Sequence, residues 1–405
     1  MSKPKIRFKG YCNDWERRKL CEICERVTRK NKNNESDLPL TIASQFGLID
    51  QRDFFNKVVA AKDMSNYYLL KKGEFAYNKS YSNGFDYGSI KRLNAYEQGC
   101  LSTLYICFGI TSDEVESNYL ECFFDTLKWY EDVSVICTEG ARNHGLLNVD
   151  TKGFFDEVTV DLPKSLEEQK KISAYLNALD HLITLHQRQC ENAKKLKKFM
   201  LQKMFPKKNQ KNPEIRFVGF TNDWERRKLG EIITEYKETV DSDCTLPILT
   251  SSRTEGVILQ EEHFGRKQQH DITGYNILPR NYCTYRNRSD GVDFTFNINK
   301  CCDKGIISKF YPVFSGNNSD VFFLSLVLNN SEEVVHEIAY TCTGTGQKVL
   351  SFLDLQKMRV RVPSFEEQKK VGEIITTLDH LITLHQNKCD ELKKLKKFML
   401  QNMFI

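Results

Sequence analysis

Cysteine and histidine are the side chains of this sequence that could hold a metal ion, and they occur at two informative spacings. Cys21 and Cys24 form a Cys-x-x-Cys pair, which is typical of zinc sites. His186 and Cys190 lie four positions apart, and the same pair recurs later in the chain. Residues at that spacing share one face of a helix, so two such helices side by side could form a Cys2His2 zinc site.

The sequence lacks the motifs by which common enzyme classes are recognised. It has no glycine-rich phosphate loop of the form G-x-x-x-x-G-K-[ST], and Gly344-Thr345-Gly346 lacks a third glycine at the Rossmann spacing. His336-Glu337 has no second histidine with which to form the metalloprotease motif H-E-x-x-H. We therefore expect a binding protein rather than an enzyme.

The elements that carry these residues are present twice. An opening motif, Ile-Arg-Phe followed by Asn-Asp-Trp-Glu-Arg-Arg-Lys-Leu, occurs at the start of each half, and three further segments recur toward its end. The matched segments are 6–20 with 215–229, 167–171 with 366–370, 179–187 with 378–386, and 194–202 with 393–401. Between these borders the two halves differ. The chain is therefore two modules, each a variable globular domain followed by a repeated helix, and so long a period excludes a short-repeat solenoid.

This repeat decides how Cys21 and Cys24 are interpreted. In the register of the second module they face Gly230 and Ile233. A metal ligand would not be replaced by isoleucine in a domain of the same fold, so we expect both cysteines to be structural. The fourteen cysteines of the chain are scattered, and several lie in apolar segments, which predicts free thiols in a reducing compartment.

Each repeated helix begins at a capping box, in which a serine is followed three positions later by a glutamate. The boxes start at Ser165 and Ser364. Apolar residues then recur in alternating steps of three and four, which predicts a coiled coil. The expected inner positions are Ile172, Leu176, Leu179, Ile183, His186, Cys190, Ala193, Leu196 and Met200 in the first helix, and Val371, Ile375, Leu378, Ile382, His385, Cys389, Leu392, Leu395 and Met399 in the second.

Two such helices in one chain, each about forty residues and so roughly 60 Å long, can pair antiparallel within the molecule. That arrangement would give the monomer a pseudo-two-fold axis. His186 and His385, with the cysteines that follow them, would then form a polar layer that sets the register, as buried polar residues do in coiled coils. A Cys2His2 zinc site at the same level is the alternative interpretation.

The bulk composition is that of a soluble protein with a modest positive charge. Charged residues make up 28% of the 405, the formal net charge is +5, and lysines cluster within 194–198 and 207–208. Such clusters are compatible with a polyanionic partner but are also common on solvated helix faces. No window reaches the roughly 18 consecutive apolar residues of a membrane helix, and the first residues do not form a secretory signal. We therefore expect a cytoplasmic protein.

A duplicated chain with near-identical long helices and divergent domains between them resembles the specificity subunit of type I restriction-modification enzymes. The resemblance spans the chain and rests on the opening motif, the Glu-Glu-Gln-Lys-Lys helix start and the Lys-Lys-Phe-Met-Leu-Gln helix end. It implies an α+β protein with two mixed α/β target recognition domains joined by two long helices that form an intramolecular antiparallel coiled coil. The corresponding ranges are 1–163 and 207–363 for the recognition domains, and 164–206 and 364–405 for the helices, as spacers and dimerisation arms.

By the same resemblance, each recognition domain reads one half of a split double-stranded DNA sequence, and two modification subunits dock on the helices. Motor-nuclease restriction subunits complete a complex that methylates adenine and cleaves DNA with ATP. The cofactors S-adenosylmethionine, ATP and Mg²⁺ would belong to these partners, and no cofactor or catalytic site is expected in this chain. It contains no Pro-Pro, which the motif of adenine methyltransferases requires. Because the two variable domains differ, we expect an asymmetric DNA site around an unread gap.

Two other functions fit parts of the sequence. A coiled-coil scaffold without a DNA role would explain the helices, but not why the domains between fixed borders diverge. A stand-alone DNA-binding regulator would explain the divergent domains. Co-purification with a methyltransferase subunit distinguishes a specificity subunit from both.

Three polar loops with a counterpart in each module are the candidates for contact with DNA, because binding groups concentrate on loops of a rigid scaffold. The first-module candidates are Thr41, Ser44 and Gln45; Asn78, Lys79, Ser80, Tyr81 and Asn83; and Arg142, Asn143 and His144. The second-module candidates are Thr250, Ser252 and Arg253; Arg286, Asn287, Arg288 and Ser289; and Thr343, Thr345, Gln347 and Lys348. The alternative is that these are solvated turns. The tyrosines expected in the core are Tyr77, Tyr105, Tyr285 and Tyr311.

Overall fold

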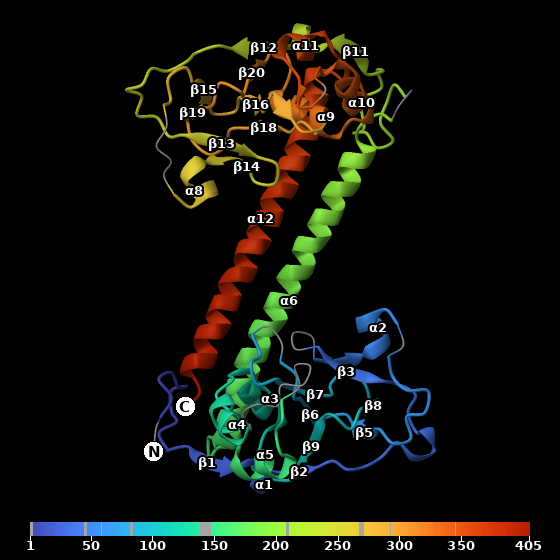
Figure 1. The fold of residues 1–405 in the computed structure, drawn as a ribbon, viewed down its shortest axis with the longest axis vertical. Coiled ribbons are helices and arrows are strands. Elements are labelled where there is room, and N and C mark those ends of the chain that lie inside the picture. The colour runs from blue at the N-terminus through green and yellow to red at the C-terminus, as the bar shows by residue number, and fades with distance from the viewer. Residues whose placement is uncertain are drawn as a thin grey trace. The chain divides into compact units, whose positions relative to one another are not determined.

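Each of the two long repeated helices is divided between two structural units of the computed structural model (Figure 1). Unit 1 comprises Met1–His186 with Asn387–Ile405, and unit 2 comprises Gln187–Gln386. Each unit therefore contains one globular domain, one half of the first helix and one half of the second. The described residues are 3–43, 47–57, 59–81, 84–137, 147–207, 210–266, 271–291, 293–344 and 346–405.

The globular domain of unit 1 is a mixed domain built on a four-stranded antiparallel sheet in the order β2-β9-β6-β7. Three two-stranded sheets, β1-β10, β3-β4 and β5-β8, complete its strands. The strands are β1 (Glu16–Lys19), β2 (Cys24–Arg26), β3 (Leu40–Ala43), β4 (Gly47–Asp50), β5 (Tyr68–Lys71), β6 (Phe75–Asn78), β7 (Ser89–Arg92), β8 (Gln98–Leu101), β9 (Ile106–Ile110) and β10 (Thr159–Leu162). The helices are α1 (Leu20–Ile23), α2 (Gln51–Phe55), α3 (Ser117–Asp125), α4 (Tyr130–Ile136) and α5 (Thr151–Glu157), with a short 3-10 turn at Lys32–Asn34.

The globular domain of unit 2 repeats this plan. Its central sheet has the order β12-β20-β16-β18, and its two-stranded sheets are β11-β22, β13-β14, β15-β19 and β17-β21. The strands are β11 (Glu225–Lys228), β12 (Ile233–Tyr236), β13 (Leu249–Ser252), β14 (Gly256–Leu259), β15 (Asn276–Pro279), β16 (Cys283–Tyr285), β17 (Arg288–Ser289), β18 (Phe296–Ile298), β19 (Lys304–Ile307), β20 (Val313–Gly316), β21 (Lys348–Val349) and β22 (Arg359–Val362). The helices are α7 (Leu229–Ile232), α8 (Gln260–Phe264), α9 (Val321–Asn330), α10 (Glu332–Thr341) and α11 (Phe352–Lys357).

The core of each domain is aromatic and lies between the central sheet and its helices. Tyr77 and Tyr285 are fully buried, as predicted, and Tyr77 stacks on Phe154 with ring centroids 5.0 Å apart. Tyr105 and Tyr311 are partly buried and pack against a smaller cluster in each domain. In β6 and β16 the tyrosine and the two residues before it are all buried, so both faces of these central strands are covered.

The opening motif supplies a strand and a tryptophan that close each domain. Strand β1 pairs antiparallel with β10, the last strand before the helix, and β11 pairs with β22 in the same register. Trp15 is buried in unit 1 against Phe404, and Trp224 is buried in unit 2 against Phe205, with ring centroids 6.4 and 6.3 Å apart. The residues just after the end of one repeated helix thus complete the core that the other module's opening motif begins.

The buried end of the Glu-Glu-Gln motif explains why it recurs. In a capping box the glutamate side chain bonds back to the serine N–H. The Glu168 carboxylate instead accepts two hydrogen bonds from the guanidinium of Arg7, at 2.6 and 2.9 Å. The matching pair in unit 2 is Arg216 with Glu367, at 2.7 and 2.8 Å. A buried carboxylate needs a charged partner, and the opening motif provides it. The serines still cap, since Ser165 Oγ accepts from the Glu168 N–H at 3.4 Å.

The adjacent glutamine anchors a second helix in each unit. Gln169 accepts a hydrogen bond from the Glu116 N–H at 2.8 Å and donates to the Glu114 and Pro163 carbonyls. Gln368 accepts from the Asp320 N–H at 3.0 Å. Both glutamines are buried. These contacts hold the N-terminus of α3 or α9 against the long helix.

The long helices are α6 (Leu166–Lys203) and α12 (Phe365–Asn402). Within each unit their halves pack antiparallel, because residues early in one helix contact residues late in the other. In unit 1 the Lys396 ammonium pairs with Asp180 at 2.8 Å, and in unit 2 Lys197 pairs with Asp379. The inner positions buried on these halves are Ile172, Leu176, Leu179, Ile183, Cys190, Val371, Ile375, Leu378, Cys389 and Leu392. Ile382, His186 and His385 are partly exposed.

The prediction that Leu196 and Leu395 continue the inner row is wrong. Leu196 is 43% exposed, and Leu395 is 37% exposed. The inward position is occupied one residue later, by Lys197 and Lys396, because a step of four rather than three follows Ala193 and Leu392. The polar end of each lysine is balanced by an aspartate on the facing helix.

Candidate nucleic-acid interface

The second and third candidate loops of unit 2 meet in one small sheet. Strand β17 pairs antiparallel with β21, with Arg288 opposite Val349 and Ser289 opposite Lys348. The Leu350 N–H donates to the Asn287 carbonyl at 3.0 Å and extends this contact. Strands about sixty residues apart in sequence, Arg288–Ser289 and Lys348–Val349, therefore lie side by side and bring the second and third loops together.

The third loop of unit 2 is a tight turn closed by paired backbone hydrogen bonds. Thr343 and Val349 exchange bonds of 3.0 and 2.9 Å. Gly344 has φ +99, and a Cβ there would lie 2.3 Å from the Gln347 carbonyl oxygen, so only glycine fits. Gln347 is exposed and Lys348 half-buried, while Thr345 lies outside the described residues. The described part of the turn therefore presents an amide and an ammonium group, on Gln347 and Lys348.

Unit 1 makes a similar backbone contact at its second loop. The Leu147 N–H, which precedes α5 as Leu350 precedes α11, donates to the Lys79 carbonyl at 2.8 Å. Asn78 Oδ1 accepts a hydrogen bond from the Ser80 N–H at 3.1 Å, which stabilises the start of the second loop. Tyr81, the next residue, is exposed. Asn83, and the third-loop candidates Arg142, Asn143 and His144, lie outside the described residues.

The first candidate loop differs between the units. In unit 1 Thr41 is 6% exposed within β3, and its hydroxyl lies 3.4 Å from the hydroxyl of Tyr105, so this side chain faces the core. Ser44 and Gln45 lie outside the described residues. In unit 2 Thr250 and Ser252 are half-exposed and Arg253 is exposed. The Asn297 amide donates to Ser251 Oγ and to the Ser252 carbonyl at 2.8 Å and ties this hairpin to strand β18.

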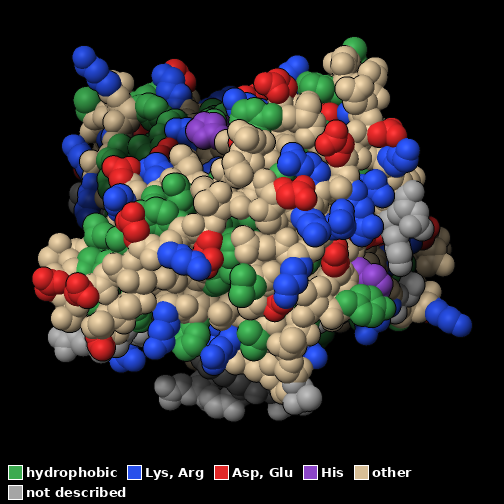
Figure 2. Space-filling model, turned by 90° about the horizontal axis from the view of Figure 1, so that it is seen from above, with side chains coloured by type: hydrophobic (Ala, Val, Ile, Leu, Met, Phe, Trp, Pro, Cys, Tyr) green, Lys and Arg blue, Asp and Glu red, His purple; other side chains and the backbone are tan. Residues whose placement is uncertain are grey.

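The exposed groups of the unit 2 surface are mainly cationic and amide side chains. Arg286 and Arg288 are exposed, and the Arg288 guanidinium lies 4.5 Å from the ring centroid of Phe310, which orients it. In unit 1, burial lowers the pKa of Lys79, and the nearby charge of Arg26 acts in the same direction. Elsewhere, on the face shown in Figure 2, Lys and Arg are interspersed with Asp and Glu. Such a surface suits hydrogen bonding to nucleic acid more than general attraction of polyanions.

The metal interpretations can be compared with the cysteine environments. Cys190 is buried, and its thiol donates to the Ile382 carbonyl and to the Gln386 side chain at 3.8 and 3.7 Å. Burial raises the pKa of Cys24 to about 12, so this thiol stays protonated. Within the described part of the chain, no three His, Cys, Asp or Glu side chains are grouped so as to hold a metal ion. The described helices also include none that is both long enough and apolar enough to cross a membrane.

A second apolar row on the long helices was missed by sequence analysis. In each unit, four large side chains on the two paired helices, between 36% and 51% exposed, point away from the inner row. We define the unit 1 outer patch as Leu182, Leu185, Leu395 and Phe398, and the unit 2 outer patch as Leu381, Leu384, Leu196 and Phe199. The recurrence of the same residues in both halves was the available signal, since a solvated face has no need of repeated leucine.

A sequence model of one protein family matches residues 221–394, and its description is type I restriction modification DNA specificity domain. The type I restriction enzyme MjaVIII specificity subunit of Methanocaldococcus jannaschii is 26% identical to this chain over 324 residues, which cover 74% of this chain and 72% of that protein.

A solved structure shares the fold. The type I restriction-modification system S subunit from M. genitalium is similar over 100% of this chain and 99% of its own, with a TM-score of 0.58. The sequence identity of that pair is 13%. The arrangement of elements is therefore common to two chains that have retained few identical residues.

Proposed function

We propose that this chain is a type I restriction-modification specificity subunit that reads an asymmetric two-part DNA sequence, one part with each globular domain. It is the DNA-recognition subunit of the complex and performs no catalytic step itself. Methylation of adenine and cleavage of DNA belong to partner subunits, together with S-adenosylmethionine, ATP and Mg²⁺. The proposed localisation is the cytoplasm.

The observation that supports two unlike readers is a similar backbone contact beneath different side chains. In each unit the second loop accepts a backbone hydrogen bond from the segment that precedes the last short helix of the domain, from Leu147 to Lys79 in unit 1 and from Leu350 to Asn287 in unit 2. The side chains of the second loops differ, with a half-buried lysine in unit 1 and two exposed arginines in unit 2. Different donors and acceptors at one position of a shared fold select different base edges.

The unit 2 surface carries the groups that read bases most specifically. An arginine can donate two hydrogen bonds to guanine, and a glutamine can pair with adenine, each worth about 1–3 kcal/mol of discrimination. Arg286 and Gln347 are exposed and so are available for such contacts. Lys348, beside them, suits a phosphate contact that positions the duplex without selecting its sequence.

Methylome sequencing of the source cell, with and without this gene, tests the function. We expect a split adenine-methylated motif that disappears on deletion. Arg286→Ala should then relax the motif in one half only, by roughly 5- to 150-fold in preference, because the other half is read by unit 1. Equal loss in both halves would contradict the assignment of one reader to each domain. If deletion of the gene leaves every methylated motif in place, a scaffold or a stand-alone regulator is the better description.

The outer patches are the proposed docking surfaces for two modification subunits. Each patch is apolar and lies on paired helices, which is a suitable surface for a helix of a partner. The two patches consist of the same residues, so they should bind two copies of one partner. Leu185 and Leu384 are exposed, and each belongs to one patch, so substitutions there should disrupt the two patches separately.

The stoichiometry of the purified complex tests this docking. The wild-type chain should hold two modification subunits, Leu185→Glu or Leu384→Glu one, and the double variant none, because a buried carboxylate destabilises an apolar interface. Glu167→Lys, on an exposed side chain of the same helix, serves as the control and should retain both. If the single variants also retain two subunits, the outer patches are not the docking surfaces.

A further inference from the structure

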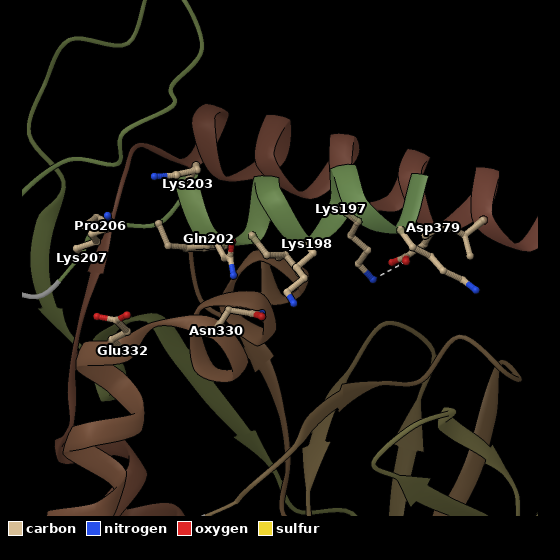
Figure 3. Close-up of a pocket in the computed structure, with 13 residues that line it drawn as sticks. Lys197, Lys198, Gln202, Lys203, Pro206, Lys207, Asn330, Glu332 and Asp379 are labelled. Atoms are coloured by element: carbon tan, nitrogen blue, oxygen red, sulfur yellow. Dashed lines mark hydrogen bonds and ion pairs between the residues drawn. The ribbon is translucent and has the colours of Figure 1, made fainter. Parts of the chain in front are cut away.

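A lysine-lined groove lies in unit 2 between the second half of α6 and the junction of α9 with α10 (Figure 3). Its volume is about 810 Å³, and its apolar lining residues include Leu201, Phe205 and Ile382. Five lysines and two carboxylates are among its lining residues. The lysines are Lys194, Lys197, Lys198, Lys203 and Lys207. We call this feature the lysine groove.

The charges of the lysine groove are unequally balanced. Lys203 and Lys207 share Glu214, and Lys197 is paired with Asp379. Among the described residues, the ion-pair partner of Lys194 is the exposed Glu191 on its own helix, at 3.2 Å. Lys198 is exposed, and the structure gives it no ion-pair partner among the described residues. Lys194 and Lys198 are one helical turn apart, on the same face of α6, so they form the available positive part of the groove.

Unit 1 contains the same helix sequence, and its Lys393 and Lys397, the counterparts of Lys194 and Lys198, are exposed as well. The two units differ at the lysine that lies between them. Lys396, which corresponds to Lys197, is held between Asp180 at 2.8 Å and Asp125 of α3 at 3.5 Å. Burial alone would lower the pKa of Lys396, but the two carboxylates outweigh it and the pKa is raised. In unit 2 the residue at the position of Asp125 is Asn329, whose amide is bonded to the backbone of Phe296 at 3.0 and 2.8 Å. Thus α9 provides no carboxylate to close over the groove.

Helix α10 connects the lysine groove to the third candidate loop for DNA contact in unit 2. Glu332 at its first position lines the groove, and Thr343, two residues beyond its end, begins the third loop. Ten helical residues span about 15 Å, which corresponds to roughly four base pairs at 3.4 Å each. The groove is therefore within reach of a duplex whose bases are read by the loops.

We propose that the lysine groove, through Lys194 and Lys198, binds the sugar–phosphate backbone of DNA beside the half-site read by unit 2. This inference rests on the proposed function. Lysine is suited to this contact because it attracts a phosphate as a point charge and needs no fixed geometry. The contact carries no sequence information, so it adds affinity and salt dependence to unit 2 alone.

The test is the salt dependence of duplex binding by the full chain in complex with its modification subunits. The duplexes contain the methylated motif or a scrambled sequence, and binding is followed by fluorescence anisotropy across a salt series. For the Lys194→Gln, Lys198→Gln double variant, the slope of log affinity against log salt should fall in magnitude by about 1.8, or about 0.9 for each lost phosphate contact. The fall should be the same on both duplexes.

The repeat supplies a matched control. Lys393→Gln with Lys397→Gln makes the same change in unit 1, where Asp125 of α3 holds a carboxylate against this part of α12 and would repel a phosphate, so its slope should be unchanged. The Lys194→Arg, Lys198→Arg double variant should restore the wild-type slope, because the charge is retained. Equal falls for both glutamine variants, or no fall for either, would overturn the proposal. Loss of the modification subunit from the Lys194, Lys198 variant would overturn it in favour of an acidic protein segment as the occupant.

Failure of the inference is distinct from failure of the proposed function. If the wild-type complex shows no preference for the methylated motif, the proposed function fails. If that preference is present and only the salt slope is insensitive to Lys194 and Lys198, the readers remain and the lysine groove is not a DNA site.

Discussion

The two units differ least where the sequence repeats and most where a single variable residue meets a repeated one. Arg7 with Glu168, and Arg216 with Glu367, form the same buried ion pair. By contrast, two copies of one helix lysine lie in different surroundings, enclosed by two aspartates in unit 1 and lining an open groove in unit 2. The repeated segments therefore give both units the same backbone, whereas the residues of the variable domain decide which lysines of the long helices are available to a partner.

The largest expected effect concerns the aromatic residues that close each core. Phe404→Ala should destabilise unit 1 by about 4 kcal/mol, because this buried ring contacts Tyr119 and Trp15 and its loss leaves a cavity. Phe205→Ala should have the same effect on unit 2. Urea unfolding followed by tryptophan fluorescence measures both. Phe398→Ala, on a half-exposed ring, is the control. An equal loss of stability there would show that Phe404 and Phe205 do not complete the cores of the two units.

The next effect tests whether the two ion pairs are equivalent. Arg7→Met should destabilise the chain by about 3 kcal/mol, because it leaves the Glu168 carboxylate buried without a charged partner. Arg216→Met should cost less, since the Trp224 indole N–H, 3.4 Å away, still donates to Glu367. The measurement is the free energy of unfolding. Arg17→Met removes an exposed pair with Asp161 and should cost under about 1 kcal/mol.

A smaller effect sharpens the difference between the two helix lysines. Asp125→Asn should cost about 1–2 kcal/mol, because Lys91 and Lys396 both lose a charged acceptor. Asp379→Asn, which affects the more exposed Lys197, should cost under about 1 kcal/mol. The raised pKa of Lys396 means that its stabilisation is present below the ordinary lysine value of 10.5 and is lost as pH rises above it. The difference between wild type and Asp125→Asn should therefore shrink above that pH in thermal melts.

The smallest effect separates the first loops. Thr41→Val should change DNA affinity by less than about 0.5 kcal/mol, because this side chain faces Tyr105 inside unit 1. Arg253→Ala should weaken binding more, since Arg253 is exposed on the equivalent hairpin of unit 2. Anisotropy titration with the methylated duplex compares the two. A larger loss for Thr41→Val would mean that the first loop of unit 1 opens when it binds DNA.

The features that could be predicted from sequence are those that depend on local periodicity or on the repeat. Steps of three and four placed the inner row of α6 up to Cys190, and the apolar neighbours of Tyr77 and Tyr285 placed both tyrosines in the core. The repeat removed the zinc interpretation of Cys21 and Cys24. Where a helix allows either a step of three or a step of four, as after Ala193, periodicity alone chose Leu196 wrongly.

By itself, the sequence determined the two modules, their borders, the start of each long helix and the absence of familiar catalytic motifs. Those properties depend on residues that are neighbours in the sequence or on the direct repetition of segments. Only the tertiary structure decided that Glu168 pairs with Arg7, that Arg288 lies opposite Val349, and that Thr41 faces inward. The physical reason is that these contacts join residues tens to more than a hundred positions apart, and their partners are selected by packing of the whole domain rather than by local propensity.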